Sequence, residues 1–324
     1  MKKICFLLNF FCLFFCNLAF SSDWIFSINP KFNLGYGNAN EYVFDTNLGH
    51  STPITPENYY ELSLLTWDIQ NSIEIGCDIE FGYKYFISDF SFCIGLPSKS
   101  GYMQDYDWLS IYTDYLTNYS IHDNKITKNY YLNFKLGAYI PLLSEKFILQ
   151  PMTGIKYDRI KFSAFDGYYQ YVSDPENSTI PWTSNIPKME MTGELIRYEV
   201  ESFFIDFSFK FTWNINSFVS FSTTISALPT IFITALDNHI ERNTYFLDHN
   251  MKGAVDFFAS TEFDFYFTKK QAITIQGHFE YLPLVSGKSY SKSSYSSLYS
   301  LSASSLGGYS KIQWGFSLGW KFKI

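Results

Sequence analysis

Strict alternation of apolar and polar residues is the feature that most constrains the fold of this chain. Across residues 312–324 every second residue is apolar, and the residues between are glycine, serine, glutamine or lysine. Successive side chains of a strand point to opposite faces, so one face suits hydrocarbon and the other suits water. The pattern recurs across residues 72–81, 131–140 and 202–213. The chain is therefore expected to be all-β.

The first 21 residues have the features of a secretory signal peptide. Two lysines precede an apolar run over residues 4–15, and small residues suited to cleavage follow at 19 and 21. The apolar run is too short for a good transmembrane helix. We therefore predict a signal peptide at 1–21 and a single β-barrel domain with five long outer loops at 22–324.

Three features favour a membrane barrel over a soluble β-sandwich, which also alternates. The apolar faces are rich in aromatic residues, which make up 21% of the chain, several polar faces carry charges, and short and long connections alternate. Short turns are expected near residues 84–89, 142–146, 214–217 and 269–271. Long polar loops are expected near residues 46–57, 106–127, 166–190, 238–250 and 286–307.

The order of these connections sets the number of strands. Five long loops interleaved with four short turns predict ten antiparallel strands, with both termini at the short-turn end. Ten is an even number, as in single-chain outer-membrane barrels. Several strands should run to roughly 20 residues, against the ~9–11 that cross a bilayer. The rim with the long loops is therefore expected to stand clear of the membrane.

Composition excludes several classes of site. After the signal peptide only Cys77 and Cys93 remain, and the alternation places them on opposite faces of the wall, so no disulfide is expected. No Cys/His cluster has the spacing of a zinc site, and neither a metal nor a cofactor is expected. The net charge of −7 and the lack of basic runs argue against a nucleic-acid partner.

Two short acidic motifs lie at the ends of predicted strands. Asp105 and Asp107 end the third strand two residues apart, so an extended chain points both carboxylates to one face. Asp237 and His239 have the same spacing at the end of the seventh strand, and both motifs therefore belong to the long-loop rim. A carboxylate beside a histidine suits the histidine to act as a general base. Solvated rim charges remain the alternative interpretation.

Other polar pairs give weaker signals. Ser120 and His122 are spaced like a serine–histidine pair, but the long loop predicted around them offers no third partner. His278 alternates inward in the ninth strand, where it is expected to line the lumen. Asp248 and His249 are adjacent, so an extended chain would point them to opposite faces.

The two acidic motifs resemble those of the omptin family of outer-membrane proteases. The family's first motif is Met-x-Asp-x-Asp-Trp, and its fixed positions are matched by Met103, Asp105, Asp107 and Trp108. The second motif is Asp-x-His near the top of the seventh strand, matched by Asp237 and His239. The resemblance covers essentially the whole mature chain. It implies a ten-stranded antiparallel transmembrane β-barrel that extends above the outer membrane, with the Asp/Asp couple opposite the Asp/His dyad.

The resemblance also points to residues that bind substrate and lipid. Leu34-Gly35 and Glu41-Tyr42-Val43-Phe44 match a first-strand motif whose glutamate lines the pocket for a basic residue, which implies substrate binding by Glu41. Many family members carry a second pocket acid where this chain has Ala235, so a looser basic preference is expected. The family's lipopolysaccharide-binding run on strand five keeps only Arg159. That residue is the remaining candidate lipid contact, and dependence on lipopolysaccharide is not implied.

The function implied by the resemblance is an outer-membrane endopeptidase. It would be a monomer with its active site facing outside, acting on peptides or proteins next to basic residues through a water activated by the four motif residues. One alternative is a non-catalytic adhesin or receptor that acts through the loops. A passive pore is disfavoured because ten strands leave a narrow lumen, and Phe204, Phe258 and Tyr266 point into it.

Overall fold

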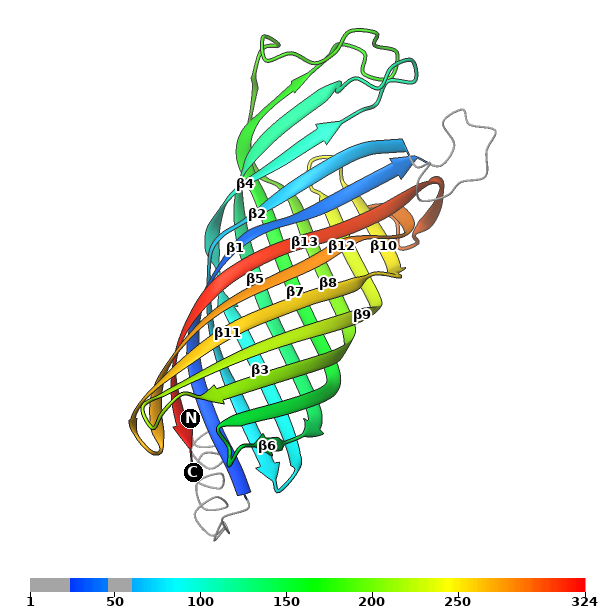
Figure 1. The fold of residues 1–324 in the computed structure, drawn as a ribbon. Helices are drawn as coiled ribbons and strands as arrows, with labels where there is room; N and C mark the ends of the chain where they lie inside the picture. Colours follow the sequence, from blue (N-terminus) through cyan, green and yellow to red (C-terminus); the bar gives the residue numbers. More distant parts are fainter. Residues whose placement is uncertain (1–23, 46–59, 324) are drawn as a thin grey trace, which may run out of the picture.

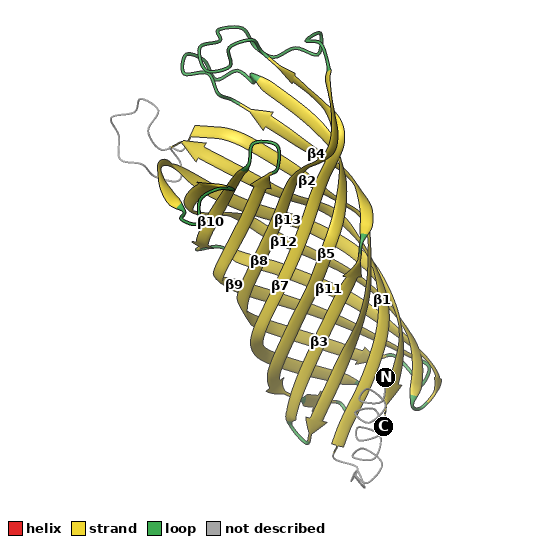
Figure 2. Ribbon diagram, turned by 180° about the vertical axis from the view of Figure 1, so that it is seen from behind, coloured by secondary structure: helices red, strands yellow, loops and turns green. Residues whose placement is uncertain are grey.

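The computed structural model describes residues 24–45 and 60–323, which form a closed antiparallel β-barrel (Figure 1, Figure 2). The predicted signal peptide and the predicted loop at 46–57 lie outside the described residues. The strands are β1 (Trp24–Asp45), β2 (Tyr60–Tyr83), β3 (Phe86–Leu96), β4 (Ser98–Asp107), β5 (Asn118–Ala138), β6 (Ile140–Leu142), β7 (Phe147–Tyr171), β8 (Met189–Asn214), β9 (Val219–His239), β10 (Thr244–Lys252), β11 (Val255–Thr268), β12 (Gln271–Ser293) and β13 (Ser300–Lys323). The described residues include no helix able to cross a membrane.

In the described part of the chain, these thirteen segments make ten barrel strands. β3 and β4 form one barrel strand because both pair with β2 and β5, and β10 and β11 form another because both pair with β9 and β12. β6 continues β5 along β7. β1 pairs with both β2 and β13, and this closes the ring. The predicted ten-stranded barrel is confirmed.

Both ends of the described chain lie at the end of the barrel with the short turns. Ser27 in β1 pairs with Lys323 in β13. Tight turns join strands at this end, and Lys84 and Leu143 adopt φ values of 52° and 48° there. Positive φ is what the tightest hairpin turns require. The opposite end, which carries the wider loops, is the rim of the barrel (Figure 2).

A broad apolar band covers the outside of the barrel below the rim. Its side chains come from almost every strand and are exposed, as a lipid-facing surface requires. They include Ile75, Ile94, Leu132, Phe134, Ile155, Phe207, Phe209, Ile225, Phe263, Ile275, Phe316 and Leu318. The band marks the membrane-spanning part of the barrel, and the upper ends of the strands stand clear of it.

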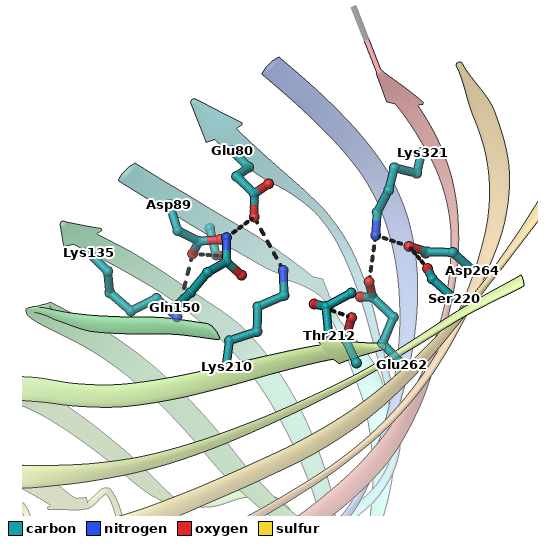
Figure 3. Close-up of polar contacts among 12 residues, drawn as sticks. Glu80, Asp89, Lys135, Gln150, Lys210, Thr212, Ser220, Glu262, Asp264 and Lys321 are labelled. Atoms are coloured by element: carbon teal, nitrogen blue, oxygen red, sulfur yellow. Dashed lines mark hydrogen bonds and ion pairs between the residues drawn. The ribbon is translucent and has the colours of Figure 1, made fainter. Parts of the chain in front are cut away.

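A polar lumen occupies the inside of the lower barrel. It contains a cavity of about 920 Å³ crossed by ion pairs (Figure 3). Lys321 Nζ lies 2.6 Å from both Glu262 Oε1 and Asp264 Oδ2, and Lys210 Nζ lies 3.3 Å from Glu80 Oε2. Charges buried in this way are tolerated when they are paired. The predicted lumen residues His278, Phe258 and Tyr266 all line this cavity.

An apolar plug separates the lumen from the rim. Its members are contributed by strands all around the barrel and are fully or almost fully buried. They include Trp67, Ile69, Met103, Phe162, Tyr198, Phe204, Leu228, Ile233, Met251 and Tyr309. The ring of Trp67 packs 5.4 Å from that of Phe162 and 5.5 Å from that of Tyr198. The inward position predicted for Phe204 is confirmed.

The strands reach further into the rim than the sequence predicted. In the structure the connections at this end shorten to residues 108–117, 172–188, 240–243 and 294–299. The upper strand segments are rich in Ser, Tyr and Asn, so their sequence resembles that of loops. They remain strands because their backbone N–H and C=O groups are hydrogen-bonded to those of the neighbouring strands. The prediction that Ser120 and His122 lie in a loop is therefore wrong, because both belong to β5.

The two cysteines do not form a bridge. Both thiols are free, as predicted. Cys93 Sγ faces the lumen side, where Asn33 Nδ2 donates a hydrogen bond to it over 2.9 Å.

Candidate active site

The Asp105/Asp107 couple lies on the inner wall of the rim, near the end of β4. Below it, Gly101 has a φ of 66° and the register of β4 against β5 shifts, so a bulge reorients the strand. Ser63 Oγ donates a hydrogen bond to Asp105 Oδ1 over 3.2 Å. Asn118 Nδ2 donates to Asp107 Oδ2 over 3.4 Å. Side chains of both flanking strands therefore hold the couple in place.

The Asp237/His239 dyad lies at the end of β9. His239 Nε2 is 2.5 Å from Asp237 Oδ2, so the predicted pair is in direct contact. Phe246 of β10 presents its ring edge-on to the imidazole at a centroid distance of 5.4 Å. Asp237 is 4% exposed, and its Oδ1 atom has no hydrogen-bond partner among the described residues. The contact orients the imidazole and leaves Nδ1 for another partner.

The couple and the dyad act on each other across the mouth of the barrel. Their strands are the third and seventh of the ten barrel strands, so they come from well-separated parts of the wall. Asp107 interacts electrostatically with His239, and Asp105 with Asp237. Arg242, in the turn that follows β9, interacts with both members of the couple. No group of three or more His, Cys, Asp or Glu residues in the described ranges is arranged to hold a metal ion.

Burial makes the couple reluctant to ionise. It raises the pKa of Asp105 well above its usual value, and the neighbouring charge of Asp107 raises it further. Burial also raises the pKa of Asp107. A raised carboxyl pKa means that folding has a free-energy cost whenever the group is charged.

This cost gives a prediction about stability. Asp105→Asn should raise the temperature at which the barrel unfolds at pH 7.5. The transition is read on a gel, where the folded and the unfolded protein run as separate bands. Because the folded pKa is the higher one, the penalty is present above it and disappears below the unfolded value of roughly 3.9, where both states are protonated. The gain should therefore vanish near pH 3. Asp123→Asn, at an exposed position, is the control, and a lower melting temperature for Asp105→Asn would contradict the burial argument.

Glu41 of β1 lies beside the dyad rather than on an outer surface. It is 3% exposed, and its Oε2 atom has no hydrogen-bond partner among the described residues. Burial raises the pKa of Glu41 well above its usual value, and the charges of Asp237 and Asp248 add to the effect. The structure thus brings Glu41, the couple and the dyad into one acidic cluster at the mouth of the barrel.

Ser120 and His122 form a separate buried pair. Ser120 Oγ lies 2.9 Å from His122 Nε2, and His122 Nδ1 lies 2.5 Å from the backbone oxygen of Asp166. The sequence suggested no third partner because a backbone carbonyl leaves no trace in side-chain spacing. Burial lowers the pKa of His122, which favours the neutral ring in this position. Ser120 pairs with Asp105 across the β4–β5 ladder, so this pair supports the wall below the couple.

Arg159 lies apart from the site, on β7. Its guanidinium is paired with Glu199 and Glu201 of β8, the second at 3.0 Å, and Tyr130 lies within 3.4 Å. The positive charge is therefore already balanced by two carboxylates. The role in lipid binding stays a prediction.

Sequence reasoning missed several residues that surround the acidic motifs. Ser63 and Asn118 hold the couple, Arg242 faces it, and Asp248 approaches Glu41. None belongs to a short motif. The register of the β9–β10 hairpin is the signal that could have found Asp248, because it pairs that residue with Ala235.

Comparison with known proteins identifies the family and the fold. The model of the omptin family matches residues 26–324. The crystal structure of the outer membrane protease OmpT from Escherichia coli superposes with a TM-score of 0.76 at 17% identity, covering 95% of this chain and 99% of that chain. The transport unit of the autotransporter AIDA-I from Escherichia coli reaches only 0.36 at 8% identity, over 95% and 92% of the two chains. No curated protein matches the chain.

The family model covers nearly all of the described chain, including both acidic motifs and the first strand with Glu41. The barrel order and closure are those described above. The chain belongs to the omptin family of outer-membrane proteases.

Proposed function

We propose that this chain is an endopeptidase that activates a water molecule between the Asp105/Asp107 couple and the Asp237/His239 dyad. The observation that carries the proposal is the contact of His239 Nε2 with Asp237 Oδ2, at a rim whose opposite wall carries the buried Asp105 and the half-buried Asp107. The arrangement needs no covalent nucleophile.

The chemistry follows from the position of each group. His239 takes a proton from the water as the oxygen attacks the carbonyl carbon of the scissile bond, and Asp237 stabilises the imidazolium that results. The couple holds the water by accepting its hydrogen bonds. When the tetrahedral intermediate collapses, His239 gives its proton to the leaving amine. Both halves of the reaction therefore use the same imidazole.

The burial of the couple favours catalysis over the alternative of an adhesin or receptor. A protein that binds through its loops gains nothing from two aspartates whose raised pKa values make the folded state less stable. Clefts with strongly shifted carboxyl pKa values are typical of catalytic sites. A role of these carboxylates in a reaction explains why the protein keeps them despite their cost in folding stability.

We also propose that Glu41 selects a basic residue next to the scissile bond. A guanidinium or ammonium that leaves water needs a carboxylate to replace its hydration. Glu41 is buried and has an unpartnered carboxylate oxygen in the acidic cluster. We place the rim, and with it the acidic cluster, on the outer side of the membrane, where it would meet peptides and proteins, with the chain acting as a monomer.

The proposed activity can be tested with the refolded barrel in detergent, with and without added lipopolysaccharide. A peptide containing a single arginine should be cut on the carboxyl side of that residue, as read by mass spectrometry. Glu41→Gln should remove roughly tenfold or more of the preference for arginine over glutamine at this position, because one charge-assisted contact is lost. Binding of the peptide without cleavage in both conditions would favour the receptor alternative.

A further inference from the structure

A second buried acid, Asp248, stands beside the proposed pocket. It lies on β10, pairs with Ala235 across the β9–β10 ladder, and is 5% exposed. Paired residues of an antiparallel ladder share a face, so Asp248 points inward beside the side chain of Ala235. His249, the next residue, is exposed, as the alternation predicts. The acid thus joins the acidic cluster from the strand next to the one that carries the dyad.

Gly307 of β13 makes room for the carboxyl group of Asp248. A Cβ atom on Gly307 would lie 1.9 Å from Asp248 Cγ and 2.1 Å from each carboxylate oxygen. Gly307 is not one of the described glycines with a positive φ. A glycine is therefore needed here for the close approach of the Asp248 carboxyl group and not for the backbone conformation. β13 is the neighbour of β1, which carries Glu41. The side chain of Asp248 therefore reaches across the wall toward Glu41.

The groups around the two acids have the chemistry of a cation site. Glu41 Oε2 and the fully buried hydroxyl of Tyr198 have no hydrogen-bond partner among the described residues. Tyr198 interacts electrostatically with both Glu41 and Asp248. Its ring stacks on Trp67 at 5.5 Å and lies 6.4 Å from Tyr309. Aromatic rings below two carboxylates complete a surface that favours a positive charge.

We propose that Asp248 is the second acid of the pocket for the basic side chain, taking the place of the acid that Ala235 lacks. This inference rests on the proposed function. It replaces the expectation of a loose basic preference, because the carboxylate has moved to the neighbouring strand. The substrate class is then a peptide with arginine before the scissile bond, since two carboxylates match the planar fork of a guanidinium better than an ammonium.

The pKa shifts agree with a site for a positive charge. Burial raises the pKa of Asp248 to about 7, and the charge of Asp237 adds to the shift. Glu41 is shifted in the same direction. Two acids that resist ionisation when no cation is near would be stabilised as carboxylates by a bound guanidinium.

The test compares two peptides that differ only in arginine or its neutral analogue citrulline before the scissile bond. Asp248→Asn should lower the arginine/citrulline ratio of kcat/KM roughly tenfold or more. Gly307→Ala should do the same while removing no charge, because its methyl group displaces the carboxylate. The double variant Asp248→Ala/Ala235→Asp, which moves the acid back to β9, should restore much of the arginine/citrulline ratio of kcat/KM. Glu241→Gln, which removes an exposed rim charge, should leave it unchanged.

Binding of the same two peptides separates this inference from the proposed function. In the His239→Ala background, calorimetry should show that Asp248→Asn weakens the binding of the arginine peptide and leaves the binding of the citrulline peptide unchanged. If wild type cuts neither peptide but binding depends on Asp248, the proposed reaction fails and the pocket stands. The assignment of Asp248 is overturned if Glu41→Gln lowers the arginine/citrulline ratio both of kcat/KM and of affinity while Asp248→Asn and Gly307→Ala change neither ratio. Gel heat-modifiability confirms that each variant is folded.

Discussion

His239→Ala should lower kcat/KM for an arginine peptide by about 10²–10⁴, with most of the loss in kcat. In the proposed reaction the imidazole, held by its contact with Asp237, takes a proton from water and returns it to the leaving amine. Loss of the ring therefore removes both proton transfers. The matched control is His249→Ala, which removes an exposed histidine ten residues away and should have little effect.

Ser120→Ala provides the contrasting result. Ser120 Oγ bonds to His122 and not to His239, so its removal should leave far more activity than His239→Ala. Hydroxylamine should trap no acyl-enzyme during turnover. A trapped hydroxamate together with complete loss of activity in Ser120→Ala would replace water activation with a covalent serine mechanism.

Asp105→Asn and Asp107→Asn should each lower kcat/KM by about 10² or more, because an amide holds the water less well and presents one acceptor instead of two. The double variant should lose much less than the product of the single losses, since both side chains act on one water. Initial rates over the three variants test this directly. Full multiplicativity would show that the two aspartates have separate roles.

The same couple links activity to stability. Asp105→Asn is expected to melt at a higher temperature and to cleave more slowly, because the burial that perturbs its carboxyl group is also what weakens the fold. An Asp123→Asn control should change neither property. A variant that lost stability together with activity would instead indicate a structural role for Asp105.

The barrel and its motifs could be predicted because they depend on local sequence. The alternation across residues 312–324 sets the inward and outward faces of β13, and a two-residue spacing places Asp105 with Asp107 on one face. The ends of the long loops could not be predicted in the same way. Above the membrane the outward residues no longer need to be apolar, so the alternation fades while the hydrogen-bonded ladder of β5 continues to Asn118.

Contacts between strands were the other part that sequence alone did not reveal. Asp248 looked unremarkable beside His249, since its meaning depends on pairing with Ala235 and on the missing side chain of Gly307. The third member of the Ser120–His122 pair was missed because it is the backbone oxygen of Asp166. In each case the deciding neighbour lies on another strand.

The apolar plug has a consequence for the traffic of peptides. Because Trp67, Phe162 and Tyr198 are packed inside the barrel beneath the acidic residues of the rim, they form an apolar floor there. In the proposed reaction a substrate would therefore lie across the mouth as an extended or looped segment, and both fragments would leave by the same mouth. The lumen cavity is lined by residues as far as the short-turn end, including Lys84 and Glu145, and the plug lies between it and the rim, so the proposed cleavage would open no path through the membrane.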